Sequence, residues 1–251
     1  MKFIYPGDSH RHSLQVLNAL YEYDDFMQSI ATVADLGCGT GEDLEWWATR
    51  TTRDDSPQPL NIQCQGIDLV ENLPVAKKYA NITYQRTDFE GKIHAPQKGF
   101  DILWCHDAFQ YCTNPVQTLS NWWHIASEGG MLAISVPQTV LTHHRQLAYY
   151  LPSGCLYHHT MVSLIHMLAM AGWNCRAGFF RQMHADPWIH AVVYKSQHSP
   201  LDPKITTWHH LSELQLLPES ADRSIYAHSH LRQQDLILPW IDKSLMSMAQ
   251  L

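Results

Sequence analysis

Hydrophobic residues along this chain gather in short runs that are separated by longer amphipathic stretches. Runs of this kind, five to eight residues long and rich in apolar side chains, are typical of strands. We therefore predict seven strands, at residues 31–36, 61–68, 82–86, 100–105, 131–136, 173–180 and 188–194.

The stretches between the strands carry apolar residues at helical spacing, as Leu14, Leu17 and Leu20 do near the start of the chain. Helices are predicted at residues 12–29, after residue 41, at 71–80, at 115–126 and twice after residue 137. Regular alternation of strand and helix predicts an α/β fold, with a doubly wound, mostly parallel seven-stranded sheet covered by helices on both faces.

Composition and charge limit the functions that such a fold can serve. The 251 residues are 45% hydrophobic, which excludes a disordered chain. With 17 basic and 24 acidic residues, the net charge is −7. We expect no nucleic acid partner, because tracking phosphates needs a basic face. Residues 146–175 contain no Asp, Glu, Lys or Arg, but polar residues interrupt every apolar run there, so we expect no membrane partner either.

The cysteines indicate a compartment. None of the six belongs to a C-x-x-C pair. The first ten residues include Lys2, Pro6, Asp8 and His10 instead of an apolar run, so we expect no secretory leader. Reduced, mostly buried thiols in a cytoplasmic protein are the expectation that follows.

A glycine-rich segment after the first strand gives the strongest sign of a ligand site. Gly37, Gly39 and Gly41 let the backbone turn tightly and approach a ligand, and the next helix begins with free N–H groups. A dinucleotide site needs a further glycine where Glu42 stands, and the Glu42 carboxylate would repel a pyrophosphate. The segment therefore favours a ligand without phosphates, although a purely structural turn fits the same residues.

Together with the acid at position 35, this segment resembles the first motif of class I S-adenosylmethionine-dependent methyltransferases, acidic-x-G-x-G-x-G. Further segments match later motifs of that family in order: GIDL, RTDFEG, FDILWCHD and SEGGMLAISVP. The resemblance covers residues 31 to about 196 and implies a Rossmann-like methyltransferase fold with S-adenosyl-L-methionine as cofactor and S-adenosyl-L-homocysteine as product. The residues that it implies for cofactor binding are Asp35, Gly37, Cys38, Gly39, Gly41, Asp68, Leu69, Asp88, Phe89 and Cys105.

The resemblance also implies individual roles for these residues. Asp68 matches the acid that holds the ribose hydroxyls, and Leu69 matches the apolar residue beside the adenine. Asp88 and Phe89 match the pair at the edge and the face of the adenine. Two of the acids have plainer interpretations, since Asp68 could cap a helix and Asp88 could belong to a solvated turn.

Three side chains are candidates for handling a proton. Many small-molecule members of the family carry a histidine where this chain has Tyr111, and tyrosine is a poor base at neutral pH. His106 follows the fourth strand, where open α/β sheets bind ligands, so it is a candidate general base, although its backbone alone could contact the cofactor. His143 is the second choice. The paired histidines elsewhere lack the spacing of metal ligands, and we predict no metal site.

The family resemblance implies an enzyme that moves a methyl group to oxygen, nitrogen or carbon of a small molecule. Five residues in the stretch without charge favour an uncharged or aromatic substrate, although helix packing explains them as well: Tyr149, Tyr150, Leu156, Tyr157 and Met161. The alternatives are other chemistry on the same fold (a cyclase, a decarboxylase or an aminopropyl transferase) and a non-catalytic cofactor-binding partner subunit.

The chain divides into three regions in this interpretation. Residues 1–30 form an N-terminal arm and helix that could act as a lid, residues 31–196 form the methyltransferase core, and residues 197–251 form a C-terminal helical extension. A homodimer is left open.

Overall fold

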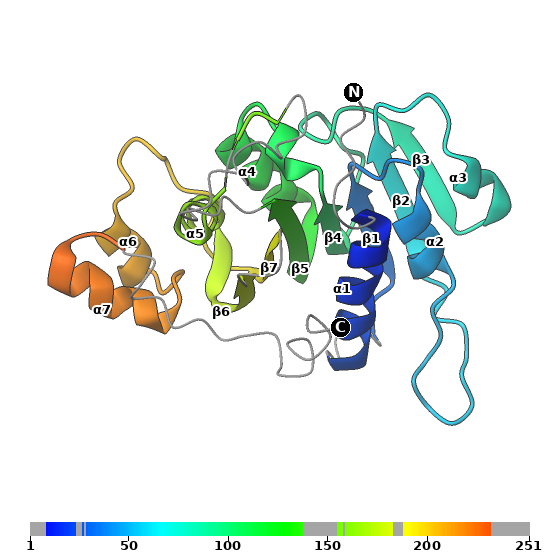
Figure 1. Ribbon diagram of the computed structural model, residues 1–251, viewed down its shortest axis with the longest axis horizontal. Coiled ribbons are helices and arrows are strands. Elements are labelled where there is room, and N and C mark those ends of the chain that lie inside the picture. Colours follow the sequence, from blue (N-terminus) through cyan, green and yellow to red (C-terminus); the bar gives the residue numbers. More distant parts are fainter. Residues whose placement is uncertain are drawn as a thin grey trace, which may run out of the picture.

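The computed structural model describes residues 9–23, 27, 29–137, 155–157, 159–182 and 188–231. Their strands are β1 (Thr32–Leu36), β2 (Gln63–Asp68), β3 (Ile82–Arg86), β4 (Phe100–His106), β5 (Ala126–Pro137), β6 (Trp173–Gln182) and β7 (Trp188–Lys195). They form one sheet in the order β3-β2-β1-β4-β5-β7-β6 (Figure 1). The strands β1 to β5 are paired in parallel, whereas β7 is antiparallel to both β5 and β6. This sheet confirms the predicted fold class.

Helices cover both faces of the sheet. They are α1 (Ser9–Tyr23), α2 (Glu42–Ala48), α3 (Pro74–Lys78), α4 (Pro115–Ile125), α5 (Met161–Met170), α6 (Trp208–Glu213), α7 (Glu219–His228) and the 3-10 helix η2 (Phe109–Tyr111). Alternate residues of β4 separate the two faces: Ile102 and Trp104 pack with α1 and α2, whereas Leu103 and Cys105 pack with α4 and α5. No helix in the described part of the chain is long and apolar enough to cross a membrane.

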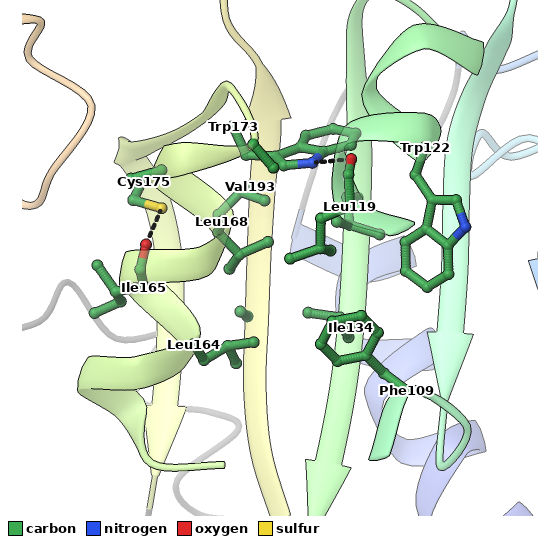
Figure 2. Close-up of a cluster of buried hydrophobic side chains, with 14 of the residues drawn as sticks. Phe109, Leu119, Trp122, Ile134, Leu164, Ile165, Leu168, Trp173, Cys175 and Val193 are labelled. Carbon is green, nitrogen blue, oxygen red and sulfur yellow. Dashed lines mark hydrogen bonds between the residues drawn. The ribbon is translucent and has the colours of Figure 1, made fainter. Parts of the chain in front are cut away.

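The larger core lies between α4, α5 and the strands β5 and β7 (Figure 2). Trp173 donates its indole N–H to the Leu119 carbonyl oxygen at 3.1 Å, and the Cys175 thiol donates to the Ile165 carbonyl oxygen at 3.8 Å. Each large apolar side chain that is fully buried here contributes roughly 1.5–3 kcal/mol to folding. The helices α6 and α7 and the segment between them bury apolar side chains in this same cluster: Leu211, Leu216, Leu217, Ala221 and Ile225.

The start of β5 differs from the prediction. The strand begins at Ala126 rather than at residue 131, directly after α4. Phe100 pairs with Ala126 while Ile102 pairs with Met131, so the residues 127–130 form a bulge in β5. The turn-like SEGG sequence hid this extension, because glycines inside a strand are typical of bulges as well as of turns.

Two predicted helices are also shorter in the structure. Of the helix expected over residues 12–29, α1 covers residues 12–23, residues 24–26 lie outside the described residues, and Ser29 lies in a turn. The helix expected over residues 71–80 begins only at Pro74, because proline suits the first turn of a helix.

Of the two helices predicted after residue 137, α5 is one. The residues 138–154, which include Tyr149 and Tyr150, lie outside the described residues. Met161 is buried at the start of α5, whereas Leu156 and Tyr157 are exposed. Helix packing therefore accounts for Met161, as the plainer interpretation of the stretch without charge predicted.

Candidate active site

The glycine loop joins β1 to α2 at the carboxyl end of the parallel strands, where such sheets bind ligands. Gly37 has a φ angle of 82°, which favours glycine. A Cβ atom at Gly37 would lie 2.4 Å from the Cβ atom of Ala108, so a larger residue overlaps there. The N–H groups of Gly37 and Cys38 donate to the Ile67 carbonyl oxygen at 2.8 and 3.2 Å, which fixes the loop against β2.

Two cavities meet at this loop and share Gly37 and Asp107. One, here named the edge cavity, has a volume of about 300 Å³ and lies toward the sheet edge at β3. Its lining residues are Gly37, Asp68, Leu69, Thr87, Asp88, Phe89, Glu90, Asp107, Ala108 and Tyr111. The other, the central cavity, has a volume of about 320 Å³ and lies between β1, β4, α1 and α2. Its lining residues are Ser13, Asp35, Gly37, Cys38, Gly39, Thr40, Glu42, Asp43, His106 and Asp107.

Asp68, at the end of β2, is held in place by backbone donors. One carboxylate oxygen accepts from the N–H of Gly39 at 2.8 Å. The other accepts from the N–H groups of Leu69 at 2.6 Å and Val70 at 3.1 Å. Each carboxylate oxygen has more than one acceptor site, so Asp68 can bind a ligand hydroxyl while it retains these bonds. Asp68 therefore has a structural role in the loop as well as a place in the edge cavity.

The edge cavity also has an apolar side. Leu69 is 61% exposed at its rim. Phe89 lines the same cavity and packs against Trp122, with ring centroids 6.1 Å apart. Asp88 accepts a hydrogen bond from the N–H of Glu90 at 2.9 Å. These side chains therefore give the edge cavity an apolar surface with a carboxylate beside it.

Glu90 lines the edge cavity, but its carboxylate is held by hydrogen bonds to the backbone. Its carboxylate accepts from the backbone N–H groups of Thr113 at 2.7 Å and Asn114 at 3.0 Å, just before α4. Burial raises the pKa of Glu90, but these hydrogen bonds outweigh it and lower the pKa below the usual value. Glu90 is therefore an anchored anion.

Asp35, at the end of β1, is the most deeply buried acid of the central cavity, at 3% exposure. Its Oδ2 atom has no hydrogen-bond partner among the described residues. Burial, followed by the negative charges of Asp43 and Asp68, raises the pKa of Asp35 well above its usual value. A cationic ligand group beside this carboxylate would reverse that shift, so the site is suited to a positive charge.

The helix α1 closes the central cavity from the side of α2, its neighbour on the same face of the sheet (Figure 1). Ser13 of α1 donates its hydroxyl to Asp43 of α2 at 2.6 Å. Trp104 of β4 donates its indole N–H to the other carboxylate oxygen of Asp43 at 2.8 Å. Asp43 therefore connects α1, α2 and β4 at the wall of the cavity.

Three histidines, here named the histidine cluster, lie next to that wall: His12, His106 and His190. The His12 Nδ1 and His106 Nε2 atoms are 3.0 Å apart, and the His12 ring stacks on His190 with centroids 4.9 Å apart. The centroid of the Trp188 ring lies 5.3 Å from that of His12 and 5.0 Å from that of His106. The hydroxyl oxygen of Ser135 is 2.9 Å from the Nδ1 atom of His190. Among the described residues, no group of His, Cys, Asp or Glu is arranged to hold a metal ion.

The sheet register explains how these side chains come together. His106 of β4 pairs with Ser135 of β5, and Ser135 pairs with His190 of β7. His190 pairs in turn with Arg181 of β6, which is also buried. Paired residues on adjacent strands point to the same face of a sheet. One row of polar side chains therefore crosses four strands beside the central cavity, on the face covered by α1.

Most of the predicted site residues line one of the two cavities, but Gly41 and Cys105 do not. Cys105 is fully buried on the opposite face of β4, and burial raises the pKa of its thiol. Gly41, with a φ angle of 84°, precedes α2 under the side chains of Leu73 and Val75. These two residues lie in the scaffold of the loop and the strand.

The three proton-handling candidates are separated in the structure. His106 lines the central cavity, whereas Tyr111, on η2, lines the edge cavity. Burial and, next, the charge of Asp107 raise the pKa of Tyr111, so it is protonated at neutral pH and cannot act as a base there. His143 lies outside the described residues.

Sequence reasoning missed several residues of the site. Ser13 and His12 come from the first helix, whose apolar spacing says nothing about what its polar face meets. Ser135 lies in the apolar second half of β5, and His190 lies in the buried, mostly apolar part of β7. A polar residue in a buried strand needs a partner, and this was the signal that could have found them.

Comparisons with known proteins agree with this geometry. Residues 34–134 match the family described as "Methyltransferase domain". The chain is 29% identical over 119 residues to a malonyl-[acyl-carrier protein] O-methyltransferase of Paenibacillus sp. (strain JDR-2). The aligned region covers 46% of this chain and 43% of that protein. It is also 29% identical over 107 residues to a trans-aconitate 2-methyltransferase of Deinococcus radiodurans, covering 43% of this chain and 38% of that protein. The matches thus span less than half the length of these curated relatives.

A solved structure shares the fold. It is the 1,6-didemethyltoxoflavin-N1-methyltransferase of Burkholderia thailandensis with bound 1,6-didemethyltoxoflavin and S-adenosylhomocysteine, with a TM-score of 0.51 and 13% identity over 78% of this chain and 94% of that chain. The chain therefore shares the fold of the class I methyltransferases, and its residues 34–134 are similar to the family described as "Methyltransferase domain", in line with the resemblance of the glycine loop.

Proposed function

We propose that this protein is an S-adenosyl-L-methionine-dependent methyltransferase that moves a methyl group to an oxygen, nitrogen or carbon atom of a small molecule and releases S-adenosyl-L-homocysteine. The observation that carries the proposal is the pair of cavities that meet at Gly37. Because the two cavities are adjacent and share Gly37 and Asp107, they suit an elongated ligand with an adenosine at one end and an amino acid at the other.

The edge cavity fits the adenosine. The carboxylate of Asp68 is placed to accept hydrogen bonds from ribose hydroxyls, and such charge-assisted bonds are worth more than neutral ones. Leu69 and Phe89 supply apolar contacts for the adenine, and Asp88 is available for its amino group. A bound adenine would cover the exposed side chain of Leu69.

The central cavity fits the cationic end of the ligand. Asp35, Glu42, Asp43 and Asp107 all line it, and a sulfonium and an ammonium group would offset their mutual repulsion. Asp35 has a buried oxygen free for the ammonium group. A dinucleotide would instead bring a pyrophosphate against Glu42 and Asp43 in the first turn of α2, which opposes that alternative.

Transfer to the acceptor needs the nucleophile in line with the methyl group, and most of the catalysis would come from this alignment. His106 lies in the central cavity and is the proposed general base where the acceptor must lose a proton. The names of the relatives and of the toxoflavin enzyme support a small-molecule acceptor. The four acids of the central cavity favour an acceptor without negative charge.

Isothermal titration with S-adenosylmethionine, S-adenosylhomocysteine and NAD in parallel tests the proposal. We expect micromolar binding of the two sulfur nucleosides and none of NAD. If neither nucleoside binds, the fold would be the one part of the assignment that stands. That result would favour another chemistry on the same fold or a non-catalytic role.

Two further proposals concern the surroundings of the enzyme. We propose a cytoplasmic location, supported by six cysteines that are all free: Cys38, Cys64, Cys105, Cys112, Cys155 and Cys175. We also propose that α1, within the N-terminal residues 1–30, acts as a lid on the core at 31–196, supported by the bond from Ser13 to Asp43. The extension at 197–251 and a homodimer stay predictions.

A further inference from the structure

We propose that Asp107, directly after β4, is the residue by which the site distinguishes the methyl donor from the product: its carboxylate attracts the positive charge of the sulfonium, which S-adenosylhomocysteine lacks. The inference rests on the proposed methyl transfer and deepens it, because it assigns one side chain to the exchange of product for donor. Specificity of this kind is a difference between two affinities.

The position of Asp107 between the two cavities carries this inference. The cavities have Gly37 and Asp107 in common, and glycine has no side chain. By contrast, Asp68 and Asp88 line the edge cavity alone, and Asp35 lines the central cavity alone. In S-adenosylmethionine the sulfur atom joins the adenosine to the amino acid. A ligand with its adenosine in the edge cavity and its amino acid in the central cavity therefore has its sulfur beside Asp107.

The backbone at Asp107 is held in an uncommon conformation. Its φ angle is 55°, in the left-handed region, where Asp and Asn are tolerated better than most residues other than glycine. Its N–H group donates to the Ser135 carbonyl oxygen at 3.1 Å. Backbone outliers of this kind gather at functional sites, where the surrounding structure maintains them.

The side chain of Gln110 fixes the carboxylate itself. The Gln110 Nε2 atom donates to the Asp107 carboxylate at 2.6 Å and to the Asp107 carbonyl oxygen at 3.0 Å. Gln110 is fully buried, and its own carbonyl oxygen accepts from the N–H groups of Leu156 at 2.9 Å and Tyr157 at 3.2 Å. The carboxylate is therefore in place before a ligand arrives, and such a preorganised charge costs little reorganisation.

The charge of Asp107 acts within the cavities. Next to burial, it is a cause of the raised pKa of Tyr111, which lines the edge cavity. Among the described residues, the lining of the two cavities contains no lysine or arginine that would neutralise it. Attraction between unit charges acts through space, so Asp107 can attract a sulfonium while it keeps every hydrogen bond that it makes.

The reaction removes the charge that Asp107 attracts. A lone pair of the acceptor forms the bond to the methyl carbon, and the electron pair of the carbon–sulfur bond stays on sulfur. The sulfur thus changes from a cationic sulfonium to a neutral thioether, and the acceptor carries the positive charge until it loses a proton. Asp107 therefore favours the bound donor over the bound product, which promotes the exchange of one for the other.

Calorimetric titration of the full chain tests the inference with three ligands: S-adenosylmethionine, S-adenosylhomocysteine and sinefungin. Sinefungin carries a protonated amine where the sulfonium carries its methyl group, so it separates charge from the methyl group. Asp107→Asn removes the charge, keeps the shape and suits the left-handed backbone. Asp107→Gly suits the same backbone and is the second variant. Asp88→Asn, which removes a carboxylate from the edge cavity alone, is the matched control, and thermal unfolding verifies each fold.

In both Asp107 variants we expect the affinities for S-adenosylmethionine and sinefungin to fall about tenfold relative to that for S-adenosylhomocysteine, between the strengths of a charge pair in water and near a protein surface. Asp88→Asn should change the three affinities by a similar factor. An unchanged ratio of affinities in a folded Asp107→Asn or Asp107→Gly would overturn the inference. A wild type that binds none of the three ligands would overturn the proposed function instead.

Discussion

The two cavities of the site are built in different ways. In the edge cavity, the residues follow the ends of β2 and β3, and backbone N–H groups nearby in the sequence hold the acids, as Leu69 and Val70 hold Asp68. In the central cavity, side chains from distant segments hold one another. Ser13 and Trp104 both donate to Asp43, and His12 meets His106 across 94 positions of the chain. The edge cavity is thus encoded locally, and the central cavity depends on how α1 packs; in the proposed function these are the nucleoside site and the surroundings of the acceptor.

His106→Ala should have the largest effect and should act on the central cavity alone. Loss of a general base slows turnover by about 10²–10⁴-fold. The affinity for S-adenosylhomocysteine should change little, because Asp68 in the edge cavity and Asp35 in the central cavity are both retained. Turnover is measured with an acceptor from a substrate screen, and affinity by calorimetry. Full activity of this variant would remove His106 as the base and leave alignment as the main source of catalysis.

Gly37→Ala should damage both cavities, because the residue is shared by them. The new methyl group would overlap Ala108 at 2.4 Å, and the φ angle of 82° adds strain. Together these cost about 2–5 kcal/mol of unfolding free energy, and nucleoside binding should be lost. Gly39→Ala is the matched control, since its φ angle is 52° but no atom lies within 4 Å of the new Cβ atom. Urea unfolding that finds equal losses in both variants would contradict the role of close contact with Ala108.

Asp68→Ala should weaken the binding of the nucleoside in the edge cavity. Loss of charge-assisted hydrogen bonds reduces the affinity for S-adenosylmethionine by about 1–3 kcal/mol. Three backbone N–H groups also lose their acceptor, so the free energy of unfolding should fall as well. Calorimetry with Asp88→Ala as comparison shows whether the effect belongs to the ribose position. An unchanged dissociation constant for Asp68→Ala would end the assignment of Asp68 to the ribose.

Asp35→Asn should change the free energy of unfolding of the ligand-free protein the least. The direction of that change, a gain in stability, is what the experiment tests. The folded state raises the pKa of Asp35, so it binds a proton more readily than the unfolded chain. Stability therefore falls as pH rises above about 4, the unfolded value, toward the raised folded pKa. The amide removes this dependence, so Asp35→Asn should gain stability relative to the wild type at neutral pH while binding S-adenosylmethionine less tightly. A stability difference that does not vary between pH 4 and 7 would contradict the burial of an unpaired carboxylate.

The sequence was sufficient for those parts of the molecule whose geometry depends on neighbouring residues. The tight turn at Gly37 and the acid at Asp68 follow from strand ends and glycine spacing. Cys105 shows a limit of motif matching: it lies between Trp104 and His106 on β4, and the two-residue period of a strand turns it to the opposite face. Ser13 and Asp43 could not be paired from sequence, because their contact exists only after α1 has packed on α2.

The reversed direction of β7 has a consequence for how such an enzyme can diversify. A parallel strand would reach the ligand edge of the sheet with its last residues, but β7 reaches it with its first, Trp188 and His190. The start of β7 therefore lies beside His12 and His106, although it is far along the chain from the glycine loop. In the proposed function, substitutions of Trp188 and His190 can change which acceptor is taken while the nucleoside half of the site is unchanged.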